Sequence, residues 1–388
     1  MKYASLHSIS LEWCAQKRYH KDMSLAFLEH LRVALAPPRY LAFPLSGIDI
    51  STSGVKAVRL AEQPHGLVLA AHAEEQLEPG AFIDGEYAEP AAIAVAVARA
   101  SARAGIESAN AALSESKSYL FETTTPGVTP DEWHTLVEQH LDELVPLPPA
   151  ETAFDIMPVG YGEVADRSLV GLGLARRVVD GALAVFDAAG LEVGALEGEM
   201  FAMARALMSE DDASTTLIID VGKTTTKIAI TVSRIPRFTT TIGIGGHAFT
   251  LAIQKHFGVT EQEARQVKVE RGIVSAQGNE DYLAAMFSTA AAIKDEISHW
   301  LEYWQGHGAK SGGHQPVSRA LLVGGNASVR GFREYLERAL GISVATGDVF
   351  TNFAPRDYWV PDLDSAESLA YATAIGLALR DHAPSSHA

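Results

Sequence analysis

A short stretch near the middle of the chain ends an apolar run with residues that suit a phosphate group or a metal ion. Residues 217–227 read LIIDVGKTTTK, so that Asp220 closes the apolar run and is followed by Gly222, three threonines and Lys227. A turn of this composition can present backbone N–H groups and hydroxyls to a polyanion, and the aspartate can hold a hydrated divalent cation. Taken alone, such a turn is more often a plain hairpin than a binding site.

The chain carries the same pattern a second time, and the repetition gives the motif its weight. Residues 47–59 read GIDISTSGVKAVR, and aligning Asp49 with Asp220 places Lys56 on Lys227. Two polar hairpins of one design, one in each half of the chain, predict a nucleotide clamped between two related domains.

The apolar pattern around both hairpins predicts the elements that position them. In each half, two strands joined by the polar turn precede a third strand, so that each half begins as a meander. These strands are expected within residues 45–60, 67–74, 217–232 and 237–244, and further strands at residues 320–325 and 343–346. Helices are expected over residues 89–104, 199–207, 249–256, 282–304, 332–340 and 366–380. The order of strands and helices predicts an α/β protein.

The first half also contains a segment with a different order of elements. Strands are expected at residues 110–118, 151–160 and 169–175, with a helix between the first two and another over residues 177–189. Thr129 suits the N-cap of the first helix and Pro130 its first turn, while Pro146 stops it. We therefore predict a small α+β insert.

The composition limits the compartment and the kinds of partner. The chain has 388 residues, enough for two or more domains, and 47% of them are hydrophobic. Its formal net charge of −17 argues against nucleic acid as a partner. The single cysteine, Cys14, excludes a disulfide within the chain and fits a reducing cytoplasm. No apolar run is long enough to span a bilayer. The spacing of His299, His307 and His314 matches no metal-ligand pattern, so these histidines are expected to be solvated.

Residues 1–44 are predicted to be an N-terminal extension with one short amphipathic helix. Met23 could be the true start, because MSLAFLEHLRVAL after it has a helical apolar pattern that Pro37 and Pro38 end. The extension is expected to be a loosely attached arm, and the alternative is a helix that binds a partner or a membrane surface.

Several motifs in one order resemble the actin-like ATPase superfamily, which includes actin, the heat-shock 70 chaperones, sugar kinases and FtsA. Within it, the chain is similar to the PilM family of type IV pilus assembly. The motifs are the two polar hairpins, VPLPPAETAFD (145–155), AGLEVGALEGEMFAMARAL (189–207), GIGGHAFT (243–250), LVGGNASVRG (322–331) and AIGLALR (374–380). The resemblance covers residues 23–380.

The resemblance implies a duplicated, ribonuclease-H-like two-domain fold with an inserted α+β subdomain 1C. Subdomain 1A would comprise residues 45–108 and 186–212, and 1C residues 109–185. Subdomain 2A would comprise residues 213–246 and 316–380, and 2B residues 247–315. Residues 381–388 would form a disordered tail.

The resemblance also implies roles for single residues around ATP or ADP and Mg²⁺. Asp49 and Asp220 would hold Mg²⁺ through water, and together with Glu199, which would orient the attacking water, they would form the catalytic set. Residues in both turns would cradle the phosphates, and a Gly-Gly-Asn sequence would let the adenosine approach the backbone. The implied cofactor-binding residues are Ser51, Thr52, Ser53, Gly54, Lys56, Gly222, Lys223, Thr224, Thr225, Gly245, Gly246, Lys268, Gly324, Gly325 and Asn326.

Three residues depart from the family pattern and bear on catalysis. Ser51 replaces a glycine, which would cost of order 1 kcal/mol if the position needs a positive φ. Arg265 replaces a glutamate that would accept a ribose hydroxyl. Lys223 either binds phosphate directly or points to solvent. These changes put slow ATP hydrolysis in more doubt than nucleotide binding.

The function implied is that of a cytoplasmic scaffold peripheral to the inner face of the cytoplasmic membrane. Its partner would be a PilN-like bitopic inner-membrane protein, whose cytoplasmic N-terminal peptide docks on it. Other pilus assembly ATPases and self-association are further implied contacts. Two alternatives stay open: a GspL-like component of type II secretion, and a phosphotransfer enzyme similar to sugar kinases or exopolyphosphatases.

Overall fold

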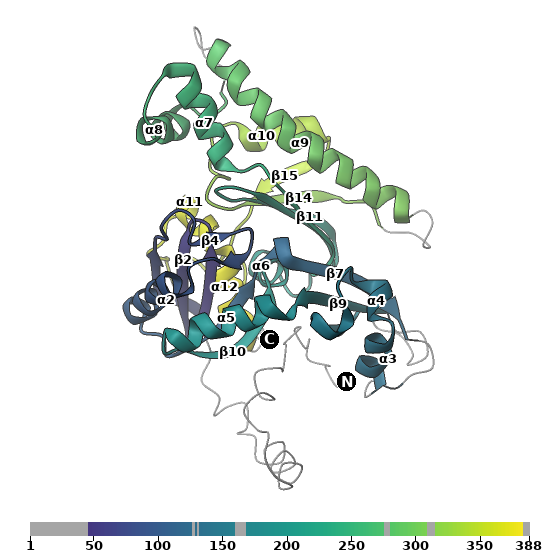
Figure 1. Ribbon diagram of the computed structural model, residues 1–388. Helices are drawn as coiled ribbons and strands as arrows, with labels where there is room; N and C mark the ends of the chain where they lie inside the picture. Colours follow the sequence, from purple (N-terminus) through teal and green to yellow (C-terminus); the bar gives the residue numbers. More distant parts are fainter. Residues whose placement is uncertain are drawn as a thin grey trace.

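The computed structural model describes residues 46–125, 129, 132–159, 168–274, 280–308 and 315–382 (Figure 1). The predicted N-terminal extension and its alternative start at Met23 lie outside the described residues, as do Pro130 of the expected helix start and the side chains of His307 and His314. The described part contains no helix that is both long and apolar enough to cross a bilayer.

The first half of the chain builds a mixed sheet of five strands in the order β10-β6-β1-β2-β3. The predicted meander is confirmed, since β2 pairs antiparallel with both β1 and β3, while β6 pairs in parallel with β1 and β10. The strand bounds are β1 Ser46–Ser51, β2 Gly54–Gln63, β3 Gly66–Glu75, β6 Ser108–Leu113 and β10 Glu192–Gly198.

The second half repeats this sheet strand for strand. Its order is β13-β12-β11-β14-β15, with an antiparallel meander followed by two parallel strands. The bounds are β11 Thr215–Val221, β12 Thr226–Val232, β13 Ile235–Ile242, β14 Arg319–Val323 and β15 Ser343–Thr346. The predicted duplication is therefore present in the topology as well as in the sequence.

The insert has a sheet of its own, in the order β7-β9-β8. The prediction that a strand at residues 110–118 opens this insert is wrong. The strand there, β6, belongs to the first large sheet, where it lies between β1 and β10 with its apolar residues buried. The insert sheet begins with β7. The predicted helix before Pro146 is split at His140 into α3 and α4. The bounds are β7 Ser118–Thr124, α3 Trp133–Gln139, α4 Leu141–Leu144, β8 Thr152–Val159 and β9 Ser168–Ala175.

Helices cover both faces of the first sheet. Ile48 of β1 packs in one core with Ile93 of α2 (Pro90–Ala104), and α5 (Arg176–Ala188) packs beside α2. On the other face, a Cβ at Gly47 would lie 1.9 Å from the carbonyl oxygen of Ala374 in α12 (Ala372–Ala378), so β1 and α12 are in backbone contact. A short hairpin, β4 (Phe82–Ile83) and β5 (Glu86–Tyr87), precedes α2.

The second half carries its own group of helices (Figure 1). The long α9 lies along α7, α10 and β13, and α8 packs on α7. Gly341 ends α10 with a positive φ, and Gly258 does the same for α7. The bounds are α7 Gly246–Phe257, α8 Glu261–Arg271, α9 Glu280–Gly308 and α10 Phe332–Leu340.

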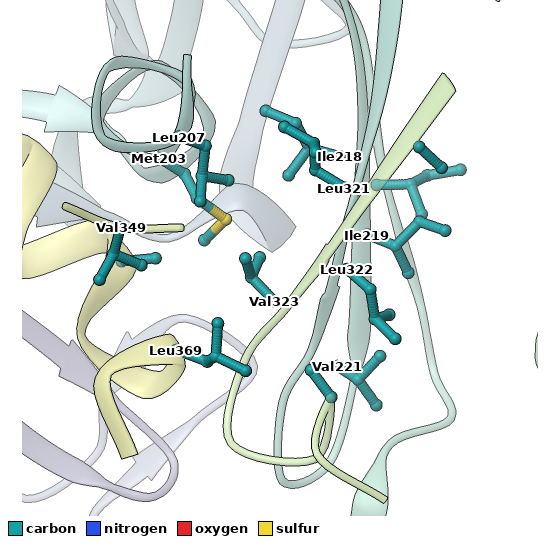
Figure 2. Close-up of a cluster of buried hydrophobic side chains, with 14 of the residues drawn as sticks. Met203, Leu207, Ile218, Ile219, Val221, Leu321, Leu322, Val323, Val349 and Leu369 are labelled. Carbon is teal, nitrogen blue, oxygen red and sulfur yellow. The ribbon is translucent and has the colours of Figure 1, made fainter. Parts of the chain in front are cut away.

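The two halves are joined by α6 (Glu199–Leu207), whose apolar side chains enter the core of the second sheet. Figure 2 shows Met203 and Leu207 facing Ile218 of β11 and Val323 of β14. Helix α12 crosses α6 closely, since a Cβ at Gly376 would lie 1.8 Å from the Ala202 carbonyl oxygen. Small residues at this crossing let two backbones touch at the joint between the domains.

The C-terminal helix predicted over residues 366–380 is not continuous. It is divided into α11 (Ser365–Ser368), a 3₁₀ turn, α12 and a last 3₁₀ turn that ends at Asp381. The Asn110 amide donates to the Asp381 carboxylate at 2.6 Å, so the predicted tail is anchored at its first residue. Residues 383–388 lie outside the described residues, and the subdomain boundaries stay a prediction.

Candidate functional site

A cleft of about 850 Å³ runs between the two halves of the molecule. The turn of each polar hairpin, the start of α6, the start of α7 and the glycines after β14 all contribute to its walls. Every predicted site residue except Gly54 and Gly245 lines it. The two halves thus bring residues from one end of the sequence to the other around a single cavity.

The two hairpins place their charged residues at equivalent positions. In the first, Asp49 of β1 lies opposite Lys56 of β2, and in the second, Asp220 of β11 lies opposite Lys227 of β12. Residues in register across an antiparallel pair have neighbouring side chains. Each hairpin therefore delivers one carboxylate and one ammonium group to the cleft.

The turns of the two hairpins meet across the cleft. The hydroxyls of Thr52 and Thr224 are 3.2 Å apart and form a hydrogen bond. Within the first turn, the Ser53 hydroxyl lies 2.9 Å from the Ser51 hydroxyl and accepts a hydrogen bond of 2.9 Å from Lys56. The space between the turns is thus bordered by hydroxyls from both domains.

The strain expected at Ser51 is absent. Among the described residues, the only non-glycine positions with a positive φ are Asp84, Ser233 and Arg234, so Ser51 has an ordinary extended backbone. The position of this turn that requires a glycine is Gly54, three residues later, where φ is +149° and a Cβ would lie 2.4 Å from a carbonyl oxygen of β3. Serine at position 51 therefore carries no backbone penalty.

The two lysines differ in their partners. Lys56 reaches the exposed carboxylate of Glu74 at 3.4 Å, whereas Lys227 lies 2.7 Å from the buried carboxylate of Glu199 at the start of α6. The backbone N–H of Glu115 donates to the same carboxylate at 2.9 Å. Glu199 is therefore held by two donors, one from the second domain and one from the turn that leads into the insert.

Burial shifts the protonation of these groups. Burial, and then the charge of Glu199, raises the pKa of Asp49 to about 7 against the opposing effect of the two lysines. Burial also raises the pKa of Asp220. Burial alone would lower the pKa of Lys227, but the carboxylates of Glu199 and both aspartates hold it above its ordinary value.

One oxygen of this cluster fits a bound cation. Oδ1 of Asp49 is buried and has no hydrogen-bond partner among the described residues. A buried polar atom without a partner is costly, and a hydrated Mg²⁺ beside it would supply one. Mg²⁺ is typically held by one or two carboxylates together with phosphate and water oxygens, which matches a pair of aspartates beside two polar turns. The donor set therefore suits a Mg²⁺–phosphate group.

The opposite wall is organised around Asn326, directly after the two glycines that follow β14. Its amide donates to the carbonyl oxygen of Gly222 at 2.9 Å, and its Oδ1 accepts from Lys268 at 2.7 Å. A Cβ at Gly246 would lie 2.0 Å from the Asn326 side chain, and one at Gly324 would lie 2.2 Å from the Asp220 carboxylate. These glycines are required because the second hairpin turn, α7 and Asn326 are in direct contact.

The start of α7 faces the same space. Gly246, His247 and Thr250 of its first turns line the cleft, and the preceding Gly245 is in an extended conformation. The N–H groups of Gly246 and His247 donate to the carbonyl oxygens of Gly222 and Lys223 at 2.9 and 2.8 Å, so this twelve-residue helix contributes the positive end of its dipole rather than free donors. An anion between the hairpin turns would meet favourable potential here.

Two residues of the site, Glu115 and Lys227, were not among those predicted from the sequence. Glu115 is buried, lines the cleft, and burial raises the pKa of its carboxyl to about 7 although a hydrogen bond from Thr239 lowers it. Nothing in the local sequence marks this glutamate, since it follows a strand without a motif. Lys227 did carry a signal, because it aligns with Lys56 in the duplicated hairpin.

Comparisons with known proteins agree with this arrangement. A family described as type IV pilus assembly protein PilM matches residues 47–382. A solved PilM–PilN type IV pilus biogenesis complex aligns with a TM-score of 0.71 at 22% identity, covering 89% of this chain and 100% of that chain. MreB5 of Spiroplasma citri bound to ADP aligns with a TM-score of 0.51 at 14% identity, covering 87% and 95% of the two chains. The predicted actin-like fold is therefore confirmed.

Among curated proteins, the cell division protein FtsA of Neisseria meningitidis serogroup B is 26% identical over 205 residues. The match covers 48% of this chain and 48% of FtsA, so it spans about half the length of that relative.

Proposed function

Because the chain belongs to the PilM family of type IV pilus assembly proteins, we propose that it is a nucleotide-binding scaffold of that machinery. It holds ADP or ATP with Mg²⁺ in the cleft between its two domains. The observation that carries this proposal is the meeting of the two equivalent hairpin turns, with a hydrogen bond of 3.2 Å between Thr52 and Thr224. Family membership also favours pilus assembly over the type II secretion alternative.

The residues would divide the nucleotide between them. Hydroxyls and N–H groups of both turns would bind the β- and γ-phosphates, helped by the N-terminus of α7. Asp49 and Asp220 would hold hydrated Mg²⁺, and bound Mg²⁺ neutralises phosphate charge. Gly324 and Gly325 would let the nucleoside approach the backbone after β14, since neither carries a Cβ.

The geometry favours binding over turnover. The resemblance assigns Glu199 to orienting an attacking water, yet its carboxylate is held by Lys227 at 2.7 Å and by the N–H of Glu115 at 2.9 Å. Positioning of the reacting groups, together with electrostatic stabilisation, supplies most of the catalysis of phosphoryl transfer. A carboxylate engaged in this way acts first as a structural link between the domains.

Titration with a fluorescent ADP analogue in the presence of Mg²⁺ tests nucleotide binding. We expect saturable binding that EDTA weakens, because the two aspartates repel the phosphates without a cation. Asp220→Asn should reduce the effect of Mg²⁺, while Asp211→Asn, an exposed acid outside the cleft, should not. If the wild-type protein neither binds the analogue nor shows a thermal shift with Mg²⁺–ATP, the nucleotide proposal is wrong.

We further propose that the protein works at the inner face of the cytoplasmic membrane through a PilN-like bitopic protein. The match to a PilM–PilN complex supports such a partner. The partner's cytoplasmic N-terminal peptide would dock on this chain, and nucleotide would shift the population of open and closed clefts that the peptide meets. Calorimetric titration of the cognate peptide into the apo and ADP-bound protein tests this, and absence of binding in both states would reject it.

A further inference from the structure

A group of cationic side chains lines the second-domain wall of the cleft, although the whole chain has a net charge of −17. We call Lys223, Arg265 and Lys268, together with the imidazole of His247 beside them, the cationic rim. Within the described part of the chain, Glu261 lies 2.5 Å from Arg265 and 3.9 Å from the His247 ring. Glu261 does not line the cleft itself. The rim therefore presents more positive than negative charge to the cavity.

Lys268 is the most informative member of the rim. Its residue is 9% exposed, and its ammonium group donates to two neutral oxygens, the Asn326 Oδ1 at 2.7 Å and the Gly246 carbonyl at 3.2 Å. Burial, and then the charge of Arg265, lowers the pKa of Lys268 to about 8. A buried cation without an anionic partner is unfavourable, and an anion between Lys268 and Arg265 would relieve both desolvation and repulsion.

The position of the rim indicates which part of a nucleotide it would meet. Lys223 belongs to the second phosphate turn, whereas Lys268 contacts Asn326 beside the glycines that follow β14. The rim thus extends from the phosphate side of the cleft to the nucleoside side. The ribose joins the 5′-phosphates to the base, so in a nucleotide bound across this wall its hydroxyls would face the rim.

We propose that the cationic rim binds a phosphate carried on the ribose, so that the preferred ligand is a nucleotide with a 2′- or 3′-phosphate in addition to its 5′-phosphates. This inference rests on the proposed nucleotide site. The same chemical logic operates in dinucleotide-binding folds, where an acidic side chain accepts the ribose hydroxyl and an arginine accommodates a 2′-phosphate. In the empty cleft the Nε and Nη2 groups of Arg265 donate to the half-exposed carboxylate of Glu261, at 3.1 and 2.5 Å, and a phosphate would take over these two parallel donors.

Competition against a fluorescent ADP analogue tests the proposal with ligands that differ in one phosphate. AMP, adenosine 3′,5′-bisphosphate and adenosine 2′,5′-bisphosphate share every group except the ribose phosphate. We expect one bisphosphate to bind about tenfold or more tightly than AMP, which is the effect of one charge-assisted hydrogen bond. Because Arg265 is half exposed, this preference should weaken as salt is raised.

Arg265→Gln should reduce the preference to about onefold to threefold. Lys255→Gln is the matched control, because it removes one positive charge from an exposed position on α7 that does not line the cleft, and it should leave the preference unchanged. Equal affinities of AMP and both bisphosphates for a protein that binds ADP overturn the inference alone. An Arg265-dependent gain for ATP over ADP, with none for the bisphosphates, assigns the rim to the 5′ chain and also overturns it. Failure to bind the ADP analogue rejects the nucleotide site and the inference together.

Discussion

Asp49→Asn is expected to stabilise the ligand-free protein at pH 7.5 and to weaken its binding of Mg²⁺–nucleotide. The carboxyl of Asp49 is buried, its Oδ1 has no partner among the described residues, and burial raises its pKa from 3.8 to about 7. Ionising this group in the empty cleft is therefore costly. The amide that replaces it keeps the shape of the side chain and removes the charge, so the cost disappears together with the cation ligand.

The sign and size of the effect follow from linkage. Between its unfolded value of 3.8 and its folded value of about 7, Asp49 binds more protons in the folded than in the unfolded state. The free energy of unfolding therefore falls as the pH rises through this window. With about 1.4 kcal/mol for each pKa unit, Asp49 costs on the order of 2 kcal/mol between pH 5.5 and 7.5. Glu115, whose pKa burial raises to about 7, acts in the same direction.

Urea unfolding followed by tryptophan fluorescence, without Mg²⁺ or nucleotide, measures the effect at both pH values. The wild-type midpoint should fall from pH 5.5 to 7.5, Asp49→Asn should remove part of the fall, and adding Glu115→Gln should remove most of the rest. Asp211→Asn, an exposed acid outside the cleft, controls for the loss of one negative charge. If Asp49→Asn and Asp211→Asn have the same pH profile as the wild type, burial of a protonated Asp49 is refuted.

Three further substitutions test other parts of the structure. Gly246→Ala places a Cβ within 2.0 Å of the Asn326 side chain and should lower ADP affinity about tenfold or more in calorimetry; unchanged affinity would show that Asn326 does not shape the site. Glu197→Ala leaves Arg205 without its buried carboxylate and should lower the free energy of unfolding by about 3–5 kcal/mol in urea titrations, whereas a loss below 1 kcal/mol would contradict this. Arg237→Gln removes the ion pair between the second domain and Glu122 of the insert, and it should change the free energy of unfolding by less than about 1 kcal/mol. It should also widen the distribution of distances between the insert and the second domain measured by fluorescence energy transfer. Unchanged distances would show that this ion pair does not hold the insert in place.

Much of the fold could be predicted because the same strand-turn-strand pattern occurs in both halves of the sequence. The strand-turn-strand pattern around Asp49 recurs around Asp220, and the two copies form sheets of the same topology. The helices expected over residues 89–104 and 332–340 both end where predicted, each followed by a glycine, Gly105 or Gly341, in the left-handed conformation that a residue without a Cβ adopts easily. The strand at residues 108–113 was assigned to the wrong sheet because pairing is a tertiary property.

Site residues that belong to a sequence motif could be predicted, whereas a residue that reaches the site only through a contact with a distant part of the chain could not. All but two of the residues implied by the motifs line the cleft, and Lys227 could have been added from its register with Asp220. Glu115 has no motif, and its part in the site depends on a backbone contact with Glu199, far along the chain. Backbone strain at Ser51 was not found, because a glycine in the family pattern does not by itself show that the backbone has a positive φ at that position.

The charges of the cleft explain why ligand binding and domain closure would be coupled. Asp49, Asp220 and Glu199 bring three carboxylates together against Lys56 and Lys227, and burial makes their ionisation costly. Mg²⁺ would compensate the aspartates, and the phosphates would compensate the lysines, so a Mg²⁺–nucleotide satisfies both sets at once. The aspartates and lysines come from both hairpins, so this compensation is complete only when the two domains are close. Since Glu199 also receives the N–H of Glu115, a change in the Lys227 pairing on nucleotide binding would reach the insert through one shared carboxylate.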